Sequence, residues 1–295
     1  MKPARTSRGV LNRNRYLGFA APSVMVMFAI MIFPLGYAVY YSLFAYKLGR
    51  EPTFVGLGNY VNLLTDRGFI GAVRFSIVFT LVTMIAQVVL GMAIALLMEN
   101  VGRSRKLLSI LIYLPYFISA TASGIIFRWI FMSDWGLLSQ VLSVFHISSP
   151  SWFDDPNWAQ LAVVLVEIWQ NTPFAVIIFY AGLQAVSSDQ MEAAAIDGAG
   201  AWRRLWHVTI PNLRHLIILV ITIRYMDAFR IYDRIAVMTG GGPGDATESV
   251  SLFAYRTAFT NLHLGKGCAA GVLILIMLAI PVSALLKLMR NAEAD

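Results

Sequence analysis

The sequence EAAAIDGAGAWRRLWHVTIP, at residues 192–211, is the most informative stretch of this chain. It is a polar stretch punctuated by glycine, and two long apolar runs flank it. Asp189 and Glu192 have the spacing of a capping box, with Asp in place of Ser or Thr, and the run MEAAAID favours a helix. Gly198 and Gly200 follow where glycine commonly ends a helix. The pattern predicts a helix that begins near Asp189 and stops before Gly198.

A second short helix is expected after this stop, over WRRLWHV. Pro211 then falls where the next apolar run begins, because the first turn of a helix tolerates proline. Ala193, Ala194 and Ala195 give the first helix a face of small side chains that another backbone can approach closely. The residues alone leave two interpretations open: an amphipathic helix lying on a membrane surface, or a helix that docks on a soluble partner.

The composition is that of a polytopic membrane protein. Of the 295 residues, 58% are hydrophobic and only 13% are charged, whereas soluble domains carry roughly 25% charged residues. The single cysteine, Cys268, excludes an intrachain disulfide framework and a cysteine-based metal site. No two of the four histidines have the spacing of metal ligands, so no metal site is expected. The net charge of +7 is better explained by loop topology than by nucleic-acid binding.

Six segments have the roughly 20 apolar residues that a spanning helix needs. They cover about 17–42, 73–98, 107–131, 159–183, 213–238 and 267–289. The first apolar run is too long for the core of a cleavable signal, which has roughly 7–15 residues. An uncleaved first span is therefore expected.

The distribution of basic residues predicts the orientation, because cytoplasmic loops are enriched in Lys and Arg. With the N-terminus inside, the inner segments hold 13 of the 23 basic residues, and the long outer loop 132–158 holds none. Both termini and the loop 186–212 are therefore expected in the cytoplasm. The inner basic residues are Lys2, Arg5, Arg8, Arg13, Arg15, Arg103, Arg105, Lys106, Arg203, Arg204, Arg214, Lys287 and Arg290.

The fifth predicted span is unusually charged, and its charged residues fall at or below its outer half: Arg224, Asp227, Arg230, Asp233 and Arg234. A charge at mid-bilayer costs about 2.5–3.5 kcal/mol on insertion scales, so such residues usually face a cavity or each other. At about 100° per residue, Asp227 shares a helix face with Arg230 and Arg234, and either arginine is spaced to pair with it.

Two interpretations of these charges remain open. They can form a structural ion-pair network, or they can line a polar path on which Phe229 and Tyr232 stack against sugar rings. The fourth span adds Glu167, Trp169, Gln170 and Asn171 just before Pro173. Proline frees a carbonyl within a helix, which favours a polar hinge near the same path.

The 192–211 stretch resembles the EAA loop of permease subunits in binding-protein-dependent ABC importers. The matching residues are Glu192, Ala193, Ala194, Asp197, Gly198, Val208, Ile210 and Pro211. Val208 and Ile210 stand where the family often has Ile and Leu. A second motif, MTGGGPG at 238–244, is followed by Thr247 and Glu248. It resembles the carbohydrate-uptake branch of these importers, which includes the maltose and glycerol-3-phosphate permeases. Further matches are WQNTP at 169–173, AGLQ at 181–184 and DAFRIYD at 227–233.

This resemblance implies an all-α membrane protein with six transmembrane helices, the type I ABC importer permease fold and a cytoplasmic EAA coupling helix. Residues 1–295 would form a single transmembrane permease domain in a bacterial inner membrane. Glu192, Ala193, Ala194, Asp197, Gly198 and Pro211 would couple the chain to an ATPase. The outer residues Gly240, Gly241, Gly242 and Pro243 would face a solute-binding protein or shape an outer gate.

The resemblance also implies the partners: a second homologous permease, two ATPase subunits, an extracytoplasmic solute-binding protein, membrane lipid and a sugar, but no nucleic acid. The sequence contains no G-x-x-x-x-G-K-[ST] phosphate loop. ATP and Mg²⁺ would therefore bind to the partner ATPase, and this chain would bind no cofactor and have no catalytic residue.

Two other functions are compatible with a polytopic membrane protein. In a stand-alone ion-coupled secondary transporter, the charged fifth span would relay protons or cations. The sequence shows no inverted repeat, however, and the EAA segment would have no purpose. A non-transporting membrane scaffold is disfavoured by the polar residues in several spans.

Overall fold

The long apolar runs of the chain fold into helices, which satisfy their own backbone hydrogen bonds as a bilayer requires. The computed structural model describes residues 11–99, 101–102 and 105–294, and the side chains of 21–291 within those ranges. Lys2, Arg5, Arg8 and Arg103 lie outside the described residues. The elements are α1 (Leu11–Ser42), β1 (Phe44–Ala45), β2 (Thr53–Phe54), α2 (Gly58–Thr65), α3 (Arg67–Glu99), α4 (Arg105–Tyr113), η1 (Leu114–Phe117), α5 (Ala120–Ile130), α6 (Leu137–Val144), α7 (Pro156–Leu183), α8 (Ser188–Ile196), α9 (Ala201–Arg204), η2 (Leu205–Thr209), α10 (Ile210–Asn212), α11 (Arg214–Phe229), α12 (Asp233–Met238), α13 (Val250–Tyr255), η3 (Arg256–Thr260) and α14 (Leu264–Ala294).

Four helices of the described chain are long and apolar enough to cross a membrane, or up to six if each of two bent helix pairs counts as one span. The four are Ala21–Ser42 of α1, α3, α7 and Leu264–Asn291 of α14. They match the first, second, fourth and sixth predicted spans. α7 runs unbroken through Pro173, so the expected hinge does not interrupt this helix.

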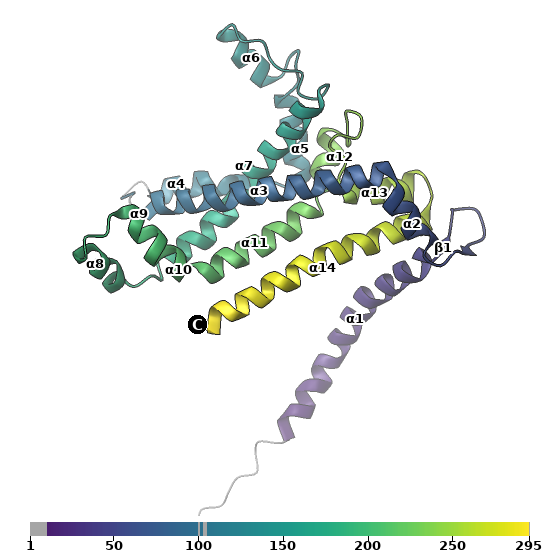
Figure 1. The fold of residues 1–295 in the computed structure, drawn as a ribbon, viewed down its shortest axis with the longest axis horizontal. Coiled ribbons are helices and arrows are strands. Elements are labelled where there is room, and N and C mark those ends of the chain that lie inside the picture. Colours follow the sequence, from purple (N-terminus) through teal and green to yellow (C-terminus); the bar gives the residue numbers. More distant parts are fainter. Residues whose placement is uncertain (1–10, 100, 103–104, 295) are drawn as a thin grey trace, which may run out of the picture.

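The central helices lie side by side (Figure 1). α3 packs against α7 and α11, and α14 packs against α11. α3 and α7 approach so closely at Gly91 that a Cβ atom there would lie 2.5 Å from the Cβ of Ala175. Small residues of this kind allow close packing of helices in membranes.

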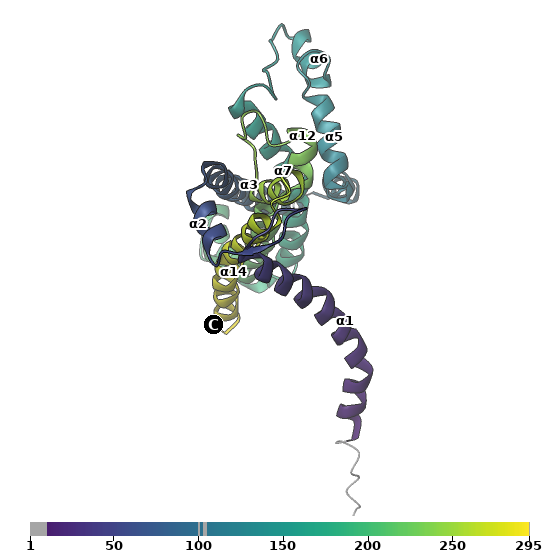
Figure 2. The same ribbon diagram turned by 90° about the vertical axis from the view of Figure 1, so that its right-hand side faces the viewer.

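α1 differs from the other long helices because it leaves the bundle (Figure 2). It contacts α14, but none of its most apolar window is buried within this chain. Met25, Ile30 and Phe33 expose between 66% and 72% of their surface. Most of this helix therefore needs an apolar environment from outside the chain.

The third predicted span was expected over 107–131 but is broken. The helix that ends in η1 and the helix α5 meet at an angle of 98°. Pro115 lies in η1, and Ser119 caps the new helix by accepting a hydrogen bond from the Ala122 amide at 3.1 Å. A proline and a local cap thus replace one continuous span with two segments.

The fifth predicted span, 213–238, is also broken. α11 ends at Phe229 and α12 begins at Asp233. Ser249 satisfies the carbonyl of Ile231 at this break, donating a hydrogen bond of 2.6 Å. Such breaks are tolerated within a membrane when other protein groups satisfy the freed backbone.

The loop 186–212 has the predicted helix–turn–helix form. α8 ends at Ile196, Gly198 has a φ of +77°, and the chain resumes as α9. The predicted capping box is wrong: α8 begins at Ser188, so Asp189 lies inside the first turn, and its N-cap residue Ser187 forms no side-chain capping bond. Pro211 lies in the short α10, which begins at Ile210, rather than at the start of α11, and the segments before and after Leu213 meet at 71°.

Candidate substrate path and coupling loop

A buried ion pair joins the fourth and fifth spans. Glu167 of α7 and Arg234 of α12 are 5% and 2% exposed, and the Arg234 guanidinium donates to the Glu167 carboxylate. The spacing in the sequence also allowed Arg234 to pair with Asp227. That pair does not form, because the break at 230–232 removes Arg234 from the helix face that Asp227 occupies. Burying two charges is tolerable only when they are paired and further hydrogen-bonded.

Gln170, one turn after Glu167, provides those further bonds. Its oxygen accepts from Arg234 and, at 2.6 Å, from the Ser123 hydroxyl of α5. Its amide nitrogen donates to the carbonyl of Ile118. Ile118 lies between η1 and α5, where helix hydrogen bonding is interrupted. The Gln170 side chain therefore provides hydrogen bonds both to the backbone carbonyl freed at the break in the third span and to the buried arginine.

A second charged cluster lies at the end of α11. Arg224 donates to Asp227 at 2.7 Å and to the Asn171 side-chain oxygen at 2.9 Å. Arg230 donates to the other Asp227 oxygen at 3.1 Å, which confirms the predicted Asp227–Arg230 pair. Asn171 also donates to Glu167 at 2.8 Å. The two clusters thus form one network across α7, α11 and α12.

A cavity of about 470 Å³ opens beside this network; we call it the path cavity. Seven of the ten predicted path residues line it: Glu167, Gln170, Asn171, Asp227, Arg230, Tyr232 and Asp233. Arg224 lies outside the lining but is hydrogen-bonded to Asn171 and Asp227.

Two predicted aromatic residues do not contribute to this lining. Phe229 is 1% exposed and packs with Ala72 and Val250, so its proposed role in stacking on a sugar is wrong. Trp169 contacts the ring of Phe127 instead of facing the cavity.

Sequence reasoning missed Ser123 as a member of the network and Arg234 as the partner of Glu167. It also missed three residues of the cavity lining: Ile118, Ala120 and Ile231. Gln87 of α3 donates to the backbone carbonyl of Glu167 at 3.1 Å and thereby bridges α3 and α7. The sequence feature that could have indicated such residues is an isolated polar side chain within an apolar span, as at Gln87 and Ser123.

The glycine loop, residues 239–247, is rigidly held. Arg256 donates to the carbonyl of Gly240 and, at 2.8 Å, to buried Glu248. Burial raises the pKa of the Glu248 carboxyl. Gln160 of α7 donates to the carbonyl of Ala246 at 2.8 Å. The loop is thereby tied to the same helix that carries Glu167.

The 186–212 loop lies beyond the other end of α11 (Figure 1). α8 contains no buried residue, and Ile196 and Trp202 expose 86% and 72% of their surface. Glu192, Ala193, Asp197, Gly198 and Pro211 are exposed, and Ala194 is half-buried. No three His, Cys, Asp or Glu side chains of the described chain gather in a way that could hold a metal ion.

Comparison with known proteins identifies the family. The family model described as "Binding-protein-dependent transport system inner membrane component" matches residues 87–292. The trehalose transport system permease protein SugA of Mycobacterium tuberculosis (strain ATCC 25618 / H37Rv) is 33% identical over 287 residues, which cover 97% of this chain and 92% of that protein. The trehalose/maltose transport system permease protein MalF of Thermococcus litoralis is 34% identical over 228 residues, or 77% of each chain.

A solved structure has the same fold. One chain of a bacterial ABC transporter involved in the import of the acidic polysaccharide alginate superposes with a TM-score of 0.81. It is 19% identical in sequence and aligns over 95% of this chain and 97% of its own. The predicted type I ABC importer permease fold is confirmed by this likeness. The chain therefore belongs to the binding-protein-dependent transport system inner membrane components, the multi-pass permease subunits of ABC importers.

Proposed function

We propose that this chain forms half of the translocation path of an ATP-driven importer for a sugar or sugar derivative. Family membership and the sugar-transport names of SugA and MalF support this proposal. They offer no support for an ion-coupled secondary transporter. A second homologous permease would complete the path, two ATPase subunits would bind ATP and Mg²⁺, and a solute-binding protein would deliver the sugar.

The observation that carries the proposal is the position of α11. This helix begins just after the exposed 186–212 loop and ends at the Asp227 cluster beside the path cavity. Its 16 residues span roughly 24 Å at 1.5 Å per residue. A rigid helix of this kind would carry a displacement of the loop directly to the path. ATP-driven closure of the motor subunits would thus bias the path between outward and inward access.

The charges of the path cavity favour a neutral carbohydrate. Arg234 is paired with Glu167, and Arg230 and Arg224 share the carboxylate of Asp227. No described arginine or lysine lines this cavity without an acidic partner. An anionic sugar would need such a free cation, because burying its charge unpaired is costly. Hydroxyl groups need only the carboxylate and amide groups already present.

The orientation of the chain is part of the proposal. The excess of basic residues in the inner segments supports cytoplasmic termini and a cytoplasmic 186–212 loop. The glycine loop would then lie on the outer side, where the solute-binding protein docks. The exposed apolar surface of α1 supports a role for this helix in contacting the second permease or lipid.

A cross-linking experiment tests the coupling role. Cys268 is replaced by Ser, Ala194 by Cys, and the chain is expressed with ATPase subunits that carry one cysteine in the cleft expected to receive α8. We expect a specific cross-link whose yield changes with ATP. Ala185→Cys, an exposed position before α8, serves as the matched control and should cross-link poorly. If Ala194→Cys assembles with the ATPase but reacts only with a water-soluble maleimide, the docking assignment is wrong.

Substrate charge is tested separately by transport in proteoliposomes. Neutral disaccharides should be taken up in an ATP-dependent manner, and their uronic-acid analogues should compete poorly. Asp233→Asn, which removes one cavity carboxylate, should improve competition by the anionic sugars. Stronger competition by the anionic sugars with the unmodified chain would contradict the neutral-substrate proposal and leave the coupling role intact.

A further inference from the structure

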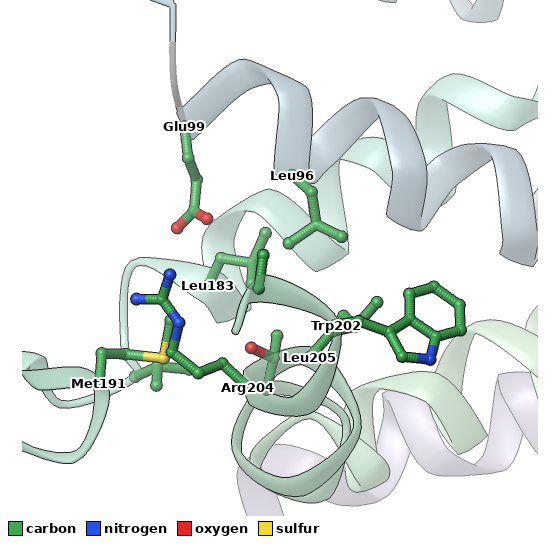
Figure 3. Close-up of a pocket in the computed structure, with 10 residues that line it drawn as sticks. Leu96, Glu99, Leu183, Met191, Trp202, Arg204 and Leu205 are labelled. Atoms are coloured by element: carbon green, nitrogen blue, oxygen red, sulfur yellow. The ribbon is translucent and has the colours of Figure 1, made fainter. Parts of the chain in front are cut away.

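A second cavity, of about 470 Å³, lies far from the path residues, where the ends of α3 and α7 meet α9 and η2. We call it the loop cavity (Figure 3). Glu99, the last residue of α3, and Arg204, the last residue of α9, both line it. In Figure 3 their charged groups extend from opposite sides into the same space. The cavity therefore presents one negative and one positive group.

These two charges have no partner within the described residues. Neither forms a salt bridge with another described residue. The Arg204 Nε atom is buried and lacks a hydrogen-bond acceptor in the described chain. A buried donor without an acceptor is costly. The Arg204 guanidinium, which forms no side-chain hydrogen bond within the described residues, can therefore receive an acceptor from a ligand in the loop cavity.

The remaining wall is apolar and lies at a membrane boundary. Leu96, Leu183 and Leu205 form much of it. Leu97, beside Glu99 on the spanning helix α3, is 66% exposed, as expected for a side chain that faces lipid. Trp202 and Trp206 are also exposed, and tryptophan is enriched at the headgroup level of membranes. The ligand should therefore carry both polar and apolar parts.

We propose that the loop cavity binds the headgroup of a zwitterionic phospholipid with a primary amine, the phosphatidylethanolamine type. The lipid phosphate accepts hydrogen bonds from Arg204, and the ammonium group donates to Glu99. The glycerol and first acyl carbons contact the leucine wall. The Glu99 carboxylate disfavours a purely anionic lipid. A choline headgroup has no N–H group to donate to Glu99.

A lipid in this position connects two parts of the fold. It bridges the end of α3, in the helix bundle, and the 186–212 loop. Its effect on transport rests on the proposed function, since it would stabilise one position of the loop relative to the bundle. The binding site itself stands on the geometry alone, and lipid binding is measured without the ATPase.

The test uses the full chain in nanodiscs that contain equal amounts of phosphatidylethanolamine, phosphatidylcholine and phosphatidylglycerol. After transfer to a mild detergent, native mass spectrometry determines which lipid the chain retains. We expect one retained phosphatidylethanolamine. Glu99→Gln and Arg204→Gln should each weaken retention about tenfold, as for the loss of one charge-assisted hydrogen bond. The matched control is Arg203→Gln, which alters an exposed neighbouring arginine outside the cavity lining and should retain lipid normally.

Three outcomes would overturn the proposal. The first is equal retention of the three lipids, and the second is retention unchanged in Glu99→Gln, a substitution at an exposed position that leaves the fold intact. The third is displacement of the lipid by soluble glycerophosphoethanolamine at equal concentration, which would identify a free zwitterion as the ligand. ATP-dependent cross-linking at Ala194 is independent of all three, so failure of this proposal is distinguishable from failure of the proposed function.

Discussion

The Glu167 carboxylate in α7 accepts a hydrogen bond from the Arg234 guanidinium in α12, 67 residues further along the chain. The pair holds α12 against α7 although α12 is separated from α11 by the break at 230–232. Gln170 and Asn171 satisfy further lone pairs and protons of the two charges. The fifth span is thus fixed to the fourth by buried polar bonds as well as by packing.

Removing one member of this pair should be strongly destabilising. Glu167→Ala or Arg234→Ala leaves an uncompensated buried charge, and the expected loss is about 3–5 kcal/mol in the free energy of unfolding. The double variant Glu167→Leu, Arg234→Met should lose clearly less than the sum of the two single losses, because it buries no unpaired charge. Denaturant titration of the purified chain in detergent measures all three. Additive losses would show that the two residues do not interact.

The loop 186–212 contains a matched pair of glycines for testing the turn after α8. Gly198 has a φ of +77°, whereas Gly200 has a φ of −64°, and a Cβ atom would meet nothing within 4 Å at either position. Gly198→Ala should therefore cost about 1–2 kcal/mol of local strain, the usual penalty for the left-handed region. Gly200→Ala should be nearly neutral.

This strain should be visible in the coupling function. We expect ATP-dependent transport by Gly198→Ala to fall while its expression and membrane insertion remain normal, and Gly200→Ala to transport like the unmodified chain. The measurement is sugar uptake in proteoliposomes, normalised to the amount of assembled complex. Equal activity of the two variants would mean that the turn geometry at Gly198 does not matter for coupling.

A third prediction concerns Asp66 and Lys266, which join the start of α3 to the start of α14 by a hydrogen bond of 2.6 Å. This bond holds the pKa of the Asp66 carboxyl below its usual value of 3.8. A lowered carboxyl pKa stabilises the fold above the unfolded-state pKa, and the stabilisation is lost as the pH falls through the folded-state pKa. Both side chains are 29% exposed, so the contribution should stay below about 1 kcal/mol.

Asp66→Asn isolates this charge effect, because an asparagine oxygen can still accept from the Gly68 amide as Asp66 does at 2.9 Å. The difference in unfolding free energy between the unmodified chain and Asp66→Asn should be constant near neutral pH and shrink as the pH falls below about 3.8. Lys266→Met should show the same acid dependence. A difference that stays constant down to pH 2 would contradict the ion pair.

The sequence predicted the helices and the loop better than the contacts. Hydropathy located α3, α7 and α14 because a spanning helix needs an uninterrupted apolar run. It could not predict how the breaks near Ile118 and at 230–232 are stabilised, since the groups that satisfy the freed backbone there, Gln170 and Ser249, lie far away in the chain.

The candidate path shows the same limit. Helical spacing correctly paired Asp227 with Arg230, three residues away. The partner of Arg234 and the burial of Phe229 were mispredicted, because spacing assumes a continuous helix and does not say which face meets a neighbour. Side chains that act within one turn were therefore predictable, and those that act across helices were not.

The glycine loop provides the last prediction. Gly241 and Gly244 both have positive φ, at +89° and +56°, but their surroundings differ. A Cβ atom at Gly241 would lie 3.0 Å from Leu252 Cδ2 and 3.3 Å from a guanidinium nitrogen of Arg256, whereas one at Gly244 would meet nothing within 4 Å. Both Ala variants should carry the backbone strain, and only Gly241→Ala should also displace Arg256 from Gly240 and Glu248. Gly241→Ala should thus lower the thermal stability further than Gly244→Ala. It should also weaken docking of the solute-binding protein, measured by adding that protein to the assembled transporter in nanodiscs. Identical melting temperatures for the two variants would show that Arg256 tolerates the added methyl group.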